Sequence, residues 1–413
     1  MYLLKLYPSV FFNHYHMELL SKRLTCLSES QTMAMNQKSQ DLQAQGIDVV
    51  NLSVGEPDFH TPDHIKQAAK DAVDQNYSFY SPGDGYMDLR KAVAAKFKKE
   101  NDLDYTPQQI IVSNGAKHSL ANAVMSVVDD GDEVIVPAPY WVTYVELVKL
   151  AGGTNVVINT TFENEYKVTA AELEAAITPK TKAFLICSPS NPTGSVYSKA
   201  ELKALADVLA KHPQIFIISD EIYEHINFVG KHESIAQFEG MKDRTAIING
   251  VSKGYAMTGY RIGYLAAPLW LAKACSKLQS QFTSGPSSIA QRAALKALVS
   301  ESNFTEDMKK VFERRRDIVL KGLYEIPGIK CNVPQGAFYV FPDVSSYFGK
   351  SDGETTIKNC GDISLYLLSK AYVATVPGDA FGDPNCIRLS YATADEKLVK
   401  AMSSMKEAFA KLK

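Results

Sequence analysis

The sequence predicts an α/β protein built on a mainly parallel sheet with helices on both faces, together with a smaller α+β domain. Short runs rich in Ile and Val alternate with amphipathic stretches along much of the 413-residue chain. Each run is too short for a buried helix and too continuous for a half-exposed strand, which is typical of strands covered on both faces. The amphipathic stretches between them supply the crossover helices that parallel strands require.

The first expected strand, 108–113, is closed by an Asn-Gly turn, and apolar residues at helical spacing follow it from Leu120 to Val128. Another apolar strand, YLAAP, begins at Tyr264. Together these elements predict a large domain over residues 63–310. The strands expected between them lie at 132–137, 182–188, 214–220 and 245–251.

The pattern changes from about Val311, where a long charged helix begins. It is followed by the strand-like segment GAFYVFPDV, the helical segment ISLYLLSKAYV and the strand-like segment IRLSYA. We expect residues 311–413 to form the smaller domain with residues 17–62. Residues 1–16 are apolar and aromatic but interrupted by polar residues and a proline, so we expect a disordered extension there and not a signal peptide.

Composition excludes several functional classes. Lys and Arg number 44 against 46 Asp and Glu, a net charge of −2, so no basic field for nucleic acid is expected. No uninterrupted apolar run is long enough to cross a membrane. The six cysteines lie far apart without metal-type spacing, which predicts reduced thiols and a cytoplasmic protein. His118 and His225 lack paired-ligand spacing, so no metal site is expected.

Polar residues stand at the ends of the predicted strands, where parallel sheets bind their ligands. Asp220 ends the strand at 214–220, and a partly buried carboxylate there needs a cation or strong donors. A helix N-cap is the alternative role for this residue. Lys253 follows the strand at 245–251, and a lysine with a lowered pKa is a good imine-forming nucleophile. Taken alone, a lysine extending to the surface is the alternative.

Three further positions complete the predicted ligand site. The Gly115 turn opens a helix whose free N–H groups suit a phosphate, and Arg261 can hold a phosphate with its guanidinium fork. Asn191 lies on a Pro-rich loop at the same sheet edge, although it could be a simple turn residue. A phosphate, an aldehyde captured by Lys253 and a ring nitrogen facing Asp220 together describe pyridoxal 5′-phosphate.

The chain resembles the fold-type I pyridoxal-phosphate enzymes of the class I aminotransferase family, in particular the prokaryotic-type aspartate aminotransferases. The resemblance runs from about Met17 to the C-terminus and rests on eight blocks in the family order. These blocks are LSVGEPDF (52–59), YSPGDGYMDLR (80–90), PAPYWVTY (137–144), SPSNPTG (188–194), SDEIYE (219–224), NGVSKGYAMTGYRIGY (249–264), GAFYVF (336–341) and IRLSYAT (387–393).

The resemblance implies a role for each matching residue. Lys253 would form the internal aldimine with the cofactor and then move the substrate proton. Asp220 would pair with the pyridinium nitrogen, and Tyr223 and Asn191 would hydrogen-bond the ring oxygen. Trp141 would stack on the ring. The implied phosphate ligands are the backbone around Gly115 and Ala116, together with Ser252, Arg261 and Tyr80. Lys117 is implied among the cofactor-binding residues more generally. The implied substrate-binding residues are Gly55, Lys117, Trp141, Asn191 and Arg388.

Tyr80 matches a tyrosine that reaches the neighbouring subunit's site, so the resemblance implies a homodimer. Arg388 matches the arginine that clamps the substrate α-carboxylate. No arginine lies between Lys277 and Pro286, where animal-type relatives bind the distal carboxylate from the partner subunit. In the prokaryotic-type subgroup a lysine at the position of Lys117 takes that role. A helix-start lysine pointing into solvent is the alternative.

Two further departures concern the cofactor. Gly250 stands where many relatives have a phosphate-binding serine, so that contact is lost. Tyr144 stands where some relatives have a histidine that supports the aspartate.

The implied function is a ping-pong aminotransferase acting through aldimine and ketimine states. It would move the amino group of L-aspartate or L-glutamate to 2-oxoglutarate or oxaloacetate, and aromatic or prephenate-type substrates are also compatible. The alternative on the same fold is a carbon–sulfur lyase, which would release pyruvate and ammonia from cysteine-type substrates. A remote alternative is a non-catalytic ligand sensor, but the short N-terminal extension leaves no room for a helix-turn-helix module.

Overall fold

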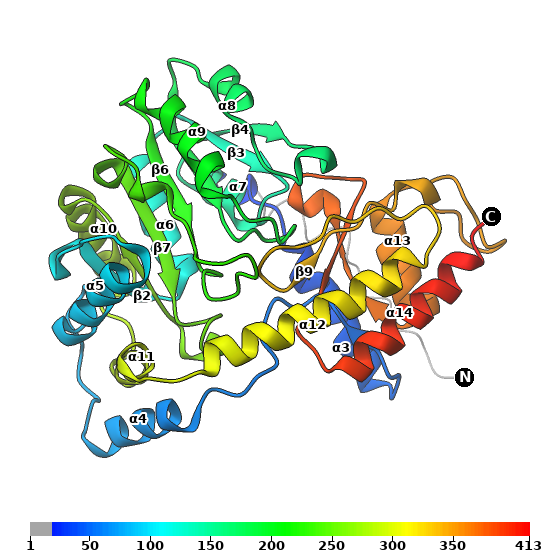
Figure 1. Cartoon of the computed structure of the whole chain (residues 1–413), viewed down its shortest axis with the longest axis horizontal. Coiled ribbons are helices and arrows are strands. Elements are labelled where there is room, and N and C mark those ends of the chain that lie inside the picture. The colour runs from blue at the N-terminus through cyan, green and yellow to red at the C-terminus, as the bar shows by residue number, and fades with distance from the viewer. Residues whose placement is uncertain (1–18) are drawn as a thin grey trace.

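The computed structural model describes residues 19–413, so the extension expected over residues 1–16 lies outside the described part. A large sheet with its helices forms one side of the molecule, and smaller sheets with α13 (Cys360–Tyr366) and α14 (Asp395–Ala410) form the other (Figure 1). The long helix α12 (Phe304–Tyr324) runs between the two sides. The large sheet is mostly parallel, which confirms the predicted fold class.

Seven strands form the large sheet in the order β2-β8-β7-β6-β5-β3-β4. Only β8 is antiparallel to its neighbours, and every other pairing in the sheet is parallel. The strands are β2 (Ile110–Asn114), β3 (Glu133–Ala138), β4 (Thr154–Asn159), β5 (Thr181–Cys187), β6 (Phe216–Asp220), β7 (Thr245–Gly250) and β8 (Ile262–Ala266).

Helices cover both faces of this sheet, and alternate residues of each strand pack on opposite faces. Leu185 and Ile218 pack on the face of α6, α7 and α10, whereas Phe184 and Ile217 pack on the opposite face. This two-sided burial explains why the strands are continuous apolar runs in the sequence. The helices of this region are α4 (Asp63–Asp74), α5 (Met87–Asn101), α6 (Ala116–Val127), α7 (Thr143–Leu150), α8 (Ala170–Ala176), α9 (Lys199–Ala210), α10 (Leu269–Phe282) and α11 (Ser288–Val299).

The predicted strands match the observed ones to within a few residues, but β4 was not predicted. This strand lies at the edge of the sheet next to β3, and only Ile158 is buried. An edge strand with one solvated face contains polar residues, so it lacks the continuous apolar run that marks the central strands.

The smaller sheets lie on the C-terminal side. The parallel pair of β1 and β10 joins the N-terminal segment to the C-terminal one, and β11, β12 and β9 form a second, antiparallel sheet. Val50 and Leu52 of the N-terminal segment share a hydrophobic core with Phe312 and Leu389. These elements are β1 (Val50–Asn51), β9 (Tyr339–Val340), β10 (Val373–Ala374), β11 (Val376–Pro377) and β12 (Ile387–Ser390), with α3 (Gln31–Ala44).

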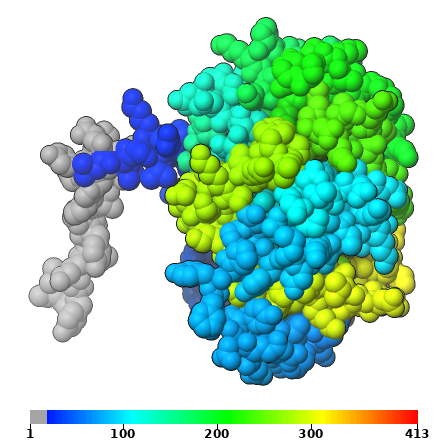
Figure 2. Space-filling view, turned by 90° about the vertical axis from the view of Figure 1, so that its left-hand side faces the viewer, coloured from blue at the N-terminus to red at the C-terminus, as the bar shows by residue number. Residues whose placement is uncertain are grey.

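The start of the described chain stands out from the body of the molecule in the space-filling view (Figure 2). It carries the short helix α2 (Lys22–Thr25), and the N–H group of Ser28 donates a hydrogen bond of 2.9 Å to the carboxylate of Glu146. Within residues 19–413, no helix has the length and apolar character needed to cross a membrane.

Candidate active site

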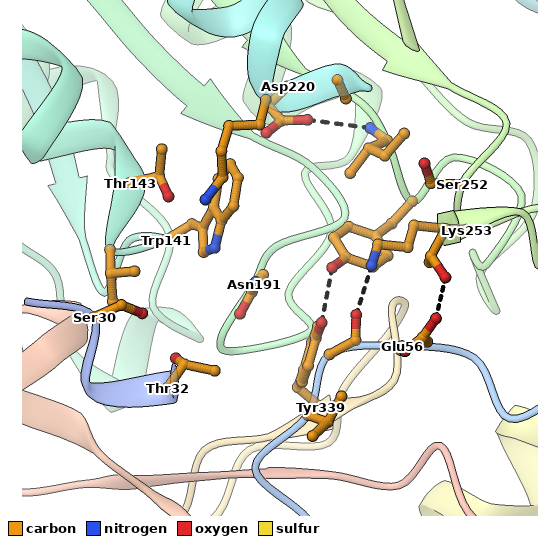
Figure 3. Close-up of a pocket in the computed structure, with 18 of the residues that line it drawn as sticks. Ser30, Thr32, Glu56, Trp141, Thr143, Asn191, Asp220, Ser252, Lys253 and Tyr339 are labelled. Atoms are coloured by element: carbon orange, nitrogen blue, oxygen red, sulfur yellow. Dashed lines mark hydrogen bonds between the residues drawn. The ribbon is translucent and has the colours of Figure 1, made fainter. Parts of the chain in front are cut away.

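A cavity of ≈ 450 Å³ lies where the ends of the large-sheet strands meet the C-terminal side of the molecule. Side chains from the upper and lower parts of the view surround one space, with Asp220 and Trp141 on one side and Lys253 on another (Figure 3). Except for Gly115 and Tyr80, every site residue predicted from the sequence lines the cavity: Gly55, Ala116, Lys117, Trp141, Asn191, Asp220, Tyr223, Ser252, Lys253, Arg261 and Arg388.

The sheet topology brings these residues to one edge. Asp220 is the last residue of β6 and pairs in register with Cys187, the last residue of β5. Lys253 follows the end of β7 by three residues. Arg261 directly precedes β8, and because β8 runs antiparallel to β7, its start lies at the edge where β7 ends.

The carboxylate of Asp220 is buried, with 3% of the residue exposed. It accepts hydrogen bonds from the Tyr144 hydroxyl at 2.7 Å and from the Ile222 N–H at 3.3 Å. Burial raises the pKa of Asp220 to about 6, against the hydrogen bond from Tyr144, which lowers it. The N-cap alternative is wrong, because turns and not a helix follow Asp220. The Tyr144 hydroxyl thus supports the Asp220 carboxylate, a role that the sequence alone did not reveal.

The amine of Lys253 lies inside the cavity, not at the surface. Its Nζ donates a hydrogen bond of 2.6 Å to the carbonyl oxygen of Gly55. Burial lowers the pKa of Lys253 to about 8, and the nearby carboxylate of Glu56 opposes this shift. A lysine with such a pKa has a substantial neutral fraction near neutral pH, which is the nucleophilic form.

Tyr223 and Asn191 are tied to side chains from the C-terminal side of the molecule. The hydroxyl groups of Tyr223 and Tyr339 lie 2.8 Å apart, and Nη1 of Arg388 donates a hydrogen bond of 3.0 Å to the side-chain oxygen of Asn191. Burial raises the pKa of Tyr223 well above its usual value. Both side chains are therefore held in fixed positions at the cavity wall.

Arg388 is almost fully buried, with 2% exposed. Its Nη2 donates a hydrogen bond of 2.6 Å to the carbonyl of Ser53, and its guanidinium lies 4.7 Å and 4.8 Å from the ring centroids of Tyr339 and Phe381. Its Nε has no hydrogen-bond partner among residues 19–413. A buried guanidinium with an unused donor suits a carboxylate ligand.

Helix α6 begins beside the guanidinium of Arg261. Gly115 is its N-cap with φ +83°, and a Cβ at this position would overlap that guanidinium. Nη1 of Arg261 donates to the Thr258 carbonyl at 3.0 Å. Ser252 lies buried in the same cavity wall. A helix N-terminus with an adjacent arginine suits a phosphate dianion.

Lys117, in the first turn of α6, is exposed, but its Nζ lies 4.9 Å from the ring centroid of Trp141. Burial and the nearby charge of Arg261 lower the pKa of Lys117. The ammonium thus lies at the cavity wall beside Trp141, while the residue stays open to solvent.

Tyr80 lies outside the cavity on a surface loop and is 99% exposed. Its neighbour Phe79 is 79% exposed. Within one chain Tyr80 therefore touches none of the cavity residues.

Sequence reasoning missed several residues of the cavity. Glu56 and Tyr339 stand in two of the matching blocks, so the blocks themselves were the available signal. Ser30 and Thr32 reach the cavity from the start of α3 (Figure 3). Nothing in their local sequence indicates this position, because it depends on how α3 packs.

Outside the cavity, Glu100, Glu224 and His225 bring their ligand atoms within 4.8 Å of one another. The buried amine of Lys96 forms ion pairs with both carboxylates, at 3.6 Å from Glu100 and more closely with Glu224. Lys96 and His225 hold the pKa of Glu224 well below its usual range, against the effect of burial. This cluster is an internal ion-pair network.

The cavity residues fit pyridoxal phosphate. Asp220 is a buried carboxylate with no cation hydrogen-bonded to it in the described part of the chain, and a protonated ring nitrogen would supply that charge. Lys253 offers an amine, and the start of α6 with Arg261 offers a phosphate site. On this mostly parallel sheet, the arrangement defines a pyridoxal-phosphate-dependent enzyme of fold type I.

The chain belongs to the class I and II aminotransferases: the sequence profile of the family described as aminotransferase class I and II matches residues 47–404. It is 49% identical over 388 residues to the aspartate/prephenate aminotransferase of Cereibacter sphaeroides, covering 93% of this chain and 97% of that one. It is 46% identical over 399 residues to the bifunctional aspartate aminotransferase and glutamate/aspartate-prephenate aminotransferase of Petunia hybrida, covering 95% and 83%.

Among solved structures, the aspartate aminotransferase of Rhizobium meliloti superposes with a TM-score of 0.92 at 42% identity, covering 95% of this chain and 99% of that chain. The aspartate aminotransferase of Thermus thermophilus, solved with maleate, superposes with a TM-score of 0.89 at 41% identity, covering 94% and 99%. These similarities confirm the family recognised in the sequence.

Proposed function

We propose that this chain transfers the amino group of L-aspartate or L-glutamate to 2-oxoglutarate or oxaloacetate, and that it also accepts prephenate-type substrates. The observation that carries this proposal is that one cavity contains two separate cationic groups beyond the phosphate site, Arg388 and Lys117. Two carboxylates of a dicarboxylic substrate need two such partners. The names of the bacterial and plant relatives, and the maleate in the Thermus thermophilus structure, support the same substrate class.

We propose that the cofactor is held at three points. Asp220 would pair with its ring nitrogen, Tyr223 and Asn191 with its ring oxygen, and Trp141 would lie against the ring. The positions of these side chains around one cavity support this assignment. The phosphate would be bound by the backbone at Gly115 and Ala116, together with Ser252 and Arg261.

When bound, pyridoxal phosphate supplies an aldehyde that takes up the amino group and an aromatic ring that withdraws electrons from the substrate. Lys253 would hold the cofactor through its amine and then carry the proton from the substrate Cα. Its lowered pKa of about 8 supports this role, because proton transfer requires the neutral amine. Asp220 would keep the ring nitrogen protonated through its negative charge.

Arg388 and Gly55 would receive the substrate α-carboxylate, and the unpaired Nε of Arg388 supports this assignment. Lys117 would receive the distal carboxylate. Prephenate carries a second carboxylate on its ring, and Lys117, which lies against Trp141 at the cavity wall, could receive that carboxylate too. This position is compatible with the additional acceptance of prephenate-type substrates.

We also propose a homodimer in which Tyr80 reaches the partner's site, consistent with its full exposure on one chain. Residues 63–310 would form the cofactor-binding domain, and residues 17–62 and 311–413 the smaller one, whose hydrophobic core also takes in Ile222, Tyr223 and Ile226 of the larger domain. A cytoplasmic location is proposed because all six cysteines are free thiols.

A panel of amino donors with 2-oxoglutarate as acceptor, and of oxo acids including prephenate with L-aspartate as donor, tests the proposal. We expect the highest kcat/KM for L-aspartate and L-glutamate as donors, with measurable transfer to prephenate. A preference for monocarboxylic donors would contradict it. Release of pyruvate and ammonia from cysteine-type substrates, without any oxo acid, would indicate the lyase reaction instead.

A further inference from the structure

The loop of residues 52–59, which connects β1 to the segment before α4, crosses the cavity wall. Two of its carbonyl oxygens accept hydrogen bonds from two cationic side chains of the site, the buried Arg388 and the half-buried Lys253. The Ser53 carbonyl accepts from Nη2 of Arg388, and the Gly55 carbonyl accepts from Nζ of Lys253, both at 2.6 Å. The position of this loop therefore bears directly on the orientation of both cationic groups.

On the side of the large sheet, the loop is held by hydroxyl groups. The Thr258 hydroxyl donates to the carboxylate of Glu56, and just beyond the loop the Thr61 hydroxyl donates to the Ala256 carbonyl at 2.6 Å. The Glu56 contact is visible in the close-up (Figure 3). These contacts fix only one side of the loop.

On the other side, the loop is held by a forked ion pair. Nη1 and Nη2 of Arg315, on α12, donate to the two carboxylate oxygens of Asp58 at 2.7 Å and 2.9 Å. Nε of Arg315 donates to Asp395 at 3.1 Å, so the same guanidinium also ties down the start of α14. Arg315 is only 7% exposed, and its guanidinium lies 5.4 Å from the ring centroid of Phe59.

We propose that Arg315 is a positioning residue that, through its fork to Asp58, holds Ser53 and Gly55 in place for Arg388 and Lys253. A planar fork fixes the orientation of a carboxylate, whereas the round ammonium of a lysine does not. The expected kinetic effect rests on the proposed function, in which Arg388 binds the substrate carboxylate. A loosened loop would weaken that binding. The phosphate contacts lie on other segments, so cofactor affinity is expected to change little.

Arg314 offers a matched control on the same helix. It also bonds to Asp395, with Nε at 2.9 Å from the carboxylate, but 58% of its side chain is exposed and it makes no hydrogen bond to Asp58. Arg314→Lys therefore makes the same chemical change next to the same acidic partner, without touching the loop.

The test compares the cofactor-loaded full chain with R315K, D58N, the double variant and R314K. Hydrogen–deuterium exchange of the peptide containing Ser53–Glu56 reports the loop, and KM, kcat and the Kd of pyridoxal phosphate report the site. We expect R315K and D58N each to speed exchange of the loop peptide and to raise KM for the amino donor about tenfold. We expect kcat to change less and the cofactor Kd to stay within about twofold. The double variant should resemble the single variants, because both remove the same fork.

Wild-type exchange of the loop peptide in both R315K and D58N would overturn the proposal, as would equal effects in R314K. If R315K does not fold, the comparison of D58N with R314K decides whether the fork holds the loop. A wild-type protein without transamination would contradict the proposed function, but the exchange measurement would still judge the role of Arg315.

Discussion

Burial moves the pKa values of two groups in the cavity toward neutrality. Asp220 rises to about 6 and Lys253 falls to about 8, because a low-dielectric site disfavours the charged form of each. Tyr144 limits the first shift by donating to the carboxylate, and the charge of Glu56 limits the second. Near pH 7, Asp220 is therefore largely ionised while roughly a tenth of Lys253 is neutral.

Tyr144→Phe is expected to weaken cofactor binding at low pH. The variant loses the hydrogen bond that lowers the pKa of Asp220, so this pKa should rise from about 6 by roughly one unit. Only ionised Asp220 pairs with a protonated ring nitrogen, so the affinity for pyridoxal phosphate should fall as pH falls through the pKa. The measurement is the Kd of pyridoxal phosphate between pH 5 and pH 8, and the decline should begin at higher pH in the variant. Superimposable curves would show that Tyr144 does not set the charge of Asp220.

Lys253→Ala should abolish transamination together with the visible absorbance that the cofactor acquires when its aldehyde bonds to this lysine, because both depend on the same amine. Absorbance spectra and coupled activity measurements on purified protein check this outcome. Lys180→Ala, a change at an exposed lysine outside the cavity, is the control and should behave as wild type. Retention of either property at the wild-type level would remove Lys253 from its proposed role.

Lys117→Ala should lower kcat/KM for dicarboxylic donors about tenfold more than for aromatic donors, since only the former present a second carboxylate. Lys117→Arg keeps the positive charge and should restore much of the dicarboxylic rate. Steady-state kinetics with L-aspartate and L-phenylalanine measure the two losses. An equal loss for both donors would mean that Lys117 does not recognise the distal carboxylate.

The contact between the start of α6 and β8 determines where the phosphate site lies. Gly263 of β8 is so close to α6 that a Cβ would overlap the backbone of Gly115 and Ala116. The same approach places Arg261 beside the first turn of the helix. The helix N-terminus and the guanidinium are therefore brought together by packing between two elements.

Gly263→Ala should displace the start of α6 and lower the free energy of unfolding by about 1–3 kcal/mol. It should also weaken binding of pyridoxal phosphate more than binding of pyridoxal, which lacks the phosphate. Denaturant unfolding and cofactor titrations measure the two effects. Gly83→Ala is the control, because a Cβ there meets no atom within 4 Å. Equal losses for the two forms of the cofactor would argue against a phosphate site at this contact.

At the scale of the whole molecule, a rigid surface loop presents large aromatic side chains to solvent. The Ser288 hydroxyl donates to the Phe79 carbonyl, and the Ser81 hydroxyl donates to the Pro286 carbonyl, both at 2.8 Å. Phe79 and Tyr80 are thus exposed on an ordered loop, which is typical of an interface. The proposed dimer would bury both side chains.

Mixed dimers test whether Tyr80 acts in the partner's site. Tyr80→Ala chains keep Lys253, and Lys253→Ala chains keep Tyr80, so a mixed dimer contains one complete site. After unfolding and refolding of an equal mixture, we expect roughly a quarter of wild-type activity, since about half of the dimers are mixed. The two variants refolded separately are the controls. No recovery above their sum would contradict a site shared between subunits.

Local sequence patterns were sufficient to predict six of the seven strands of the large sheet and the polar residues that gather at its edge. Ile- and Val-rich runs marked the buried strands, and Asp220 and Lys253 were recognised as unusual because each follows such a run. The edge strand β4 was not predicted, because its solvated face carries polar residues. The matching blocks extended the prediction to Arg388, whose hydrogen-bond partners Asn191 and Ser53 lie far from it along the chain.

The order of strands along the chain and the period of apolar residues are local properties, so the sequence alone reveals which residues follow which strand. The segments from outside the sheet that complete the cavity are known only from the folded structure. The start of α3, the carbonyls of Ser53 and Gly55 and the fork of Arg315 on Asp58 join residues up to 335 positions apart. Such contacts depend on the packing of whole elements against one another, and no local pattern specifies them.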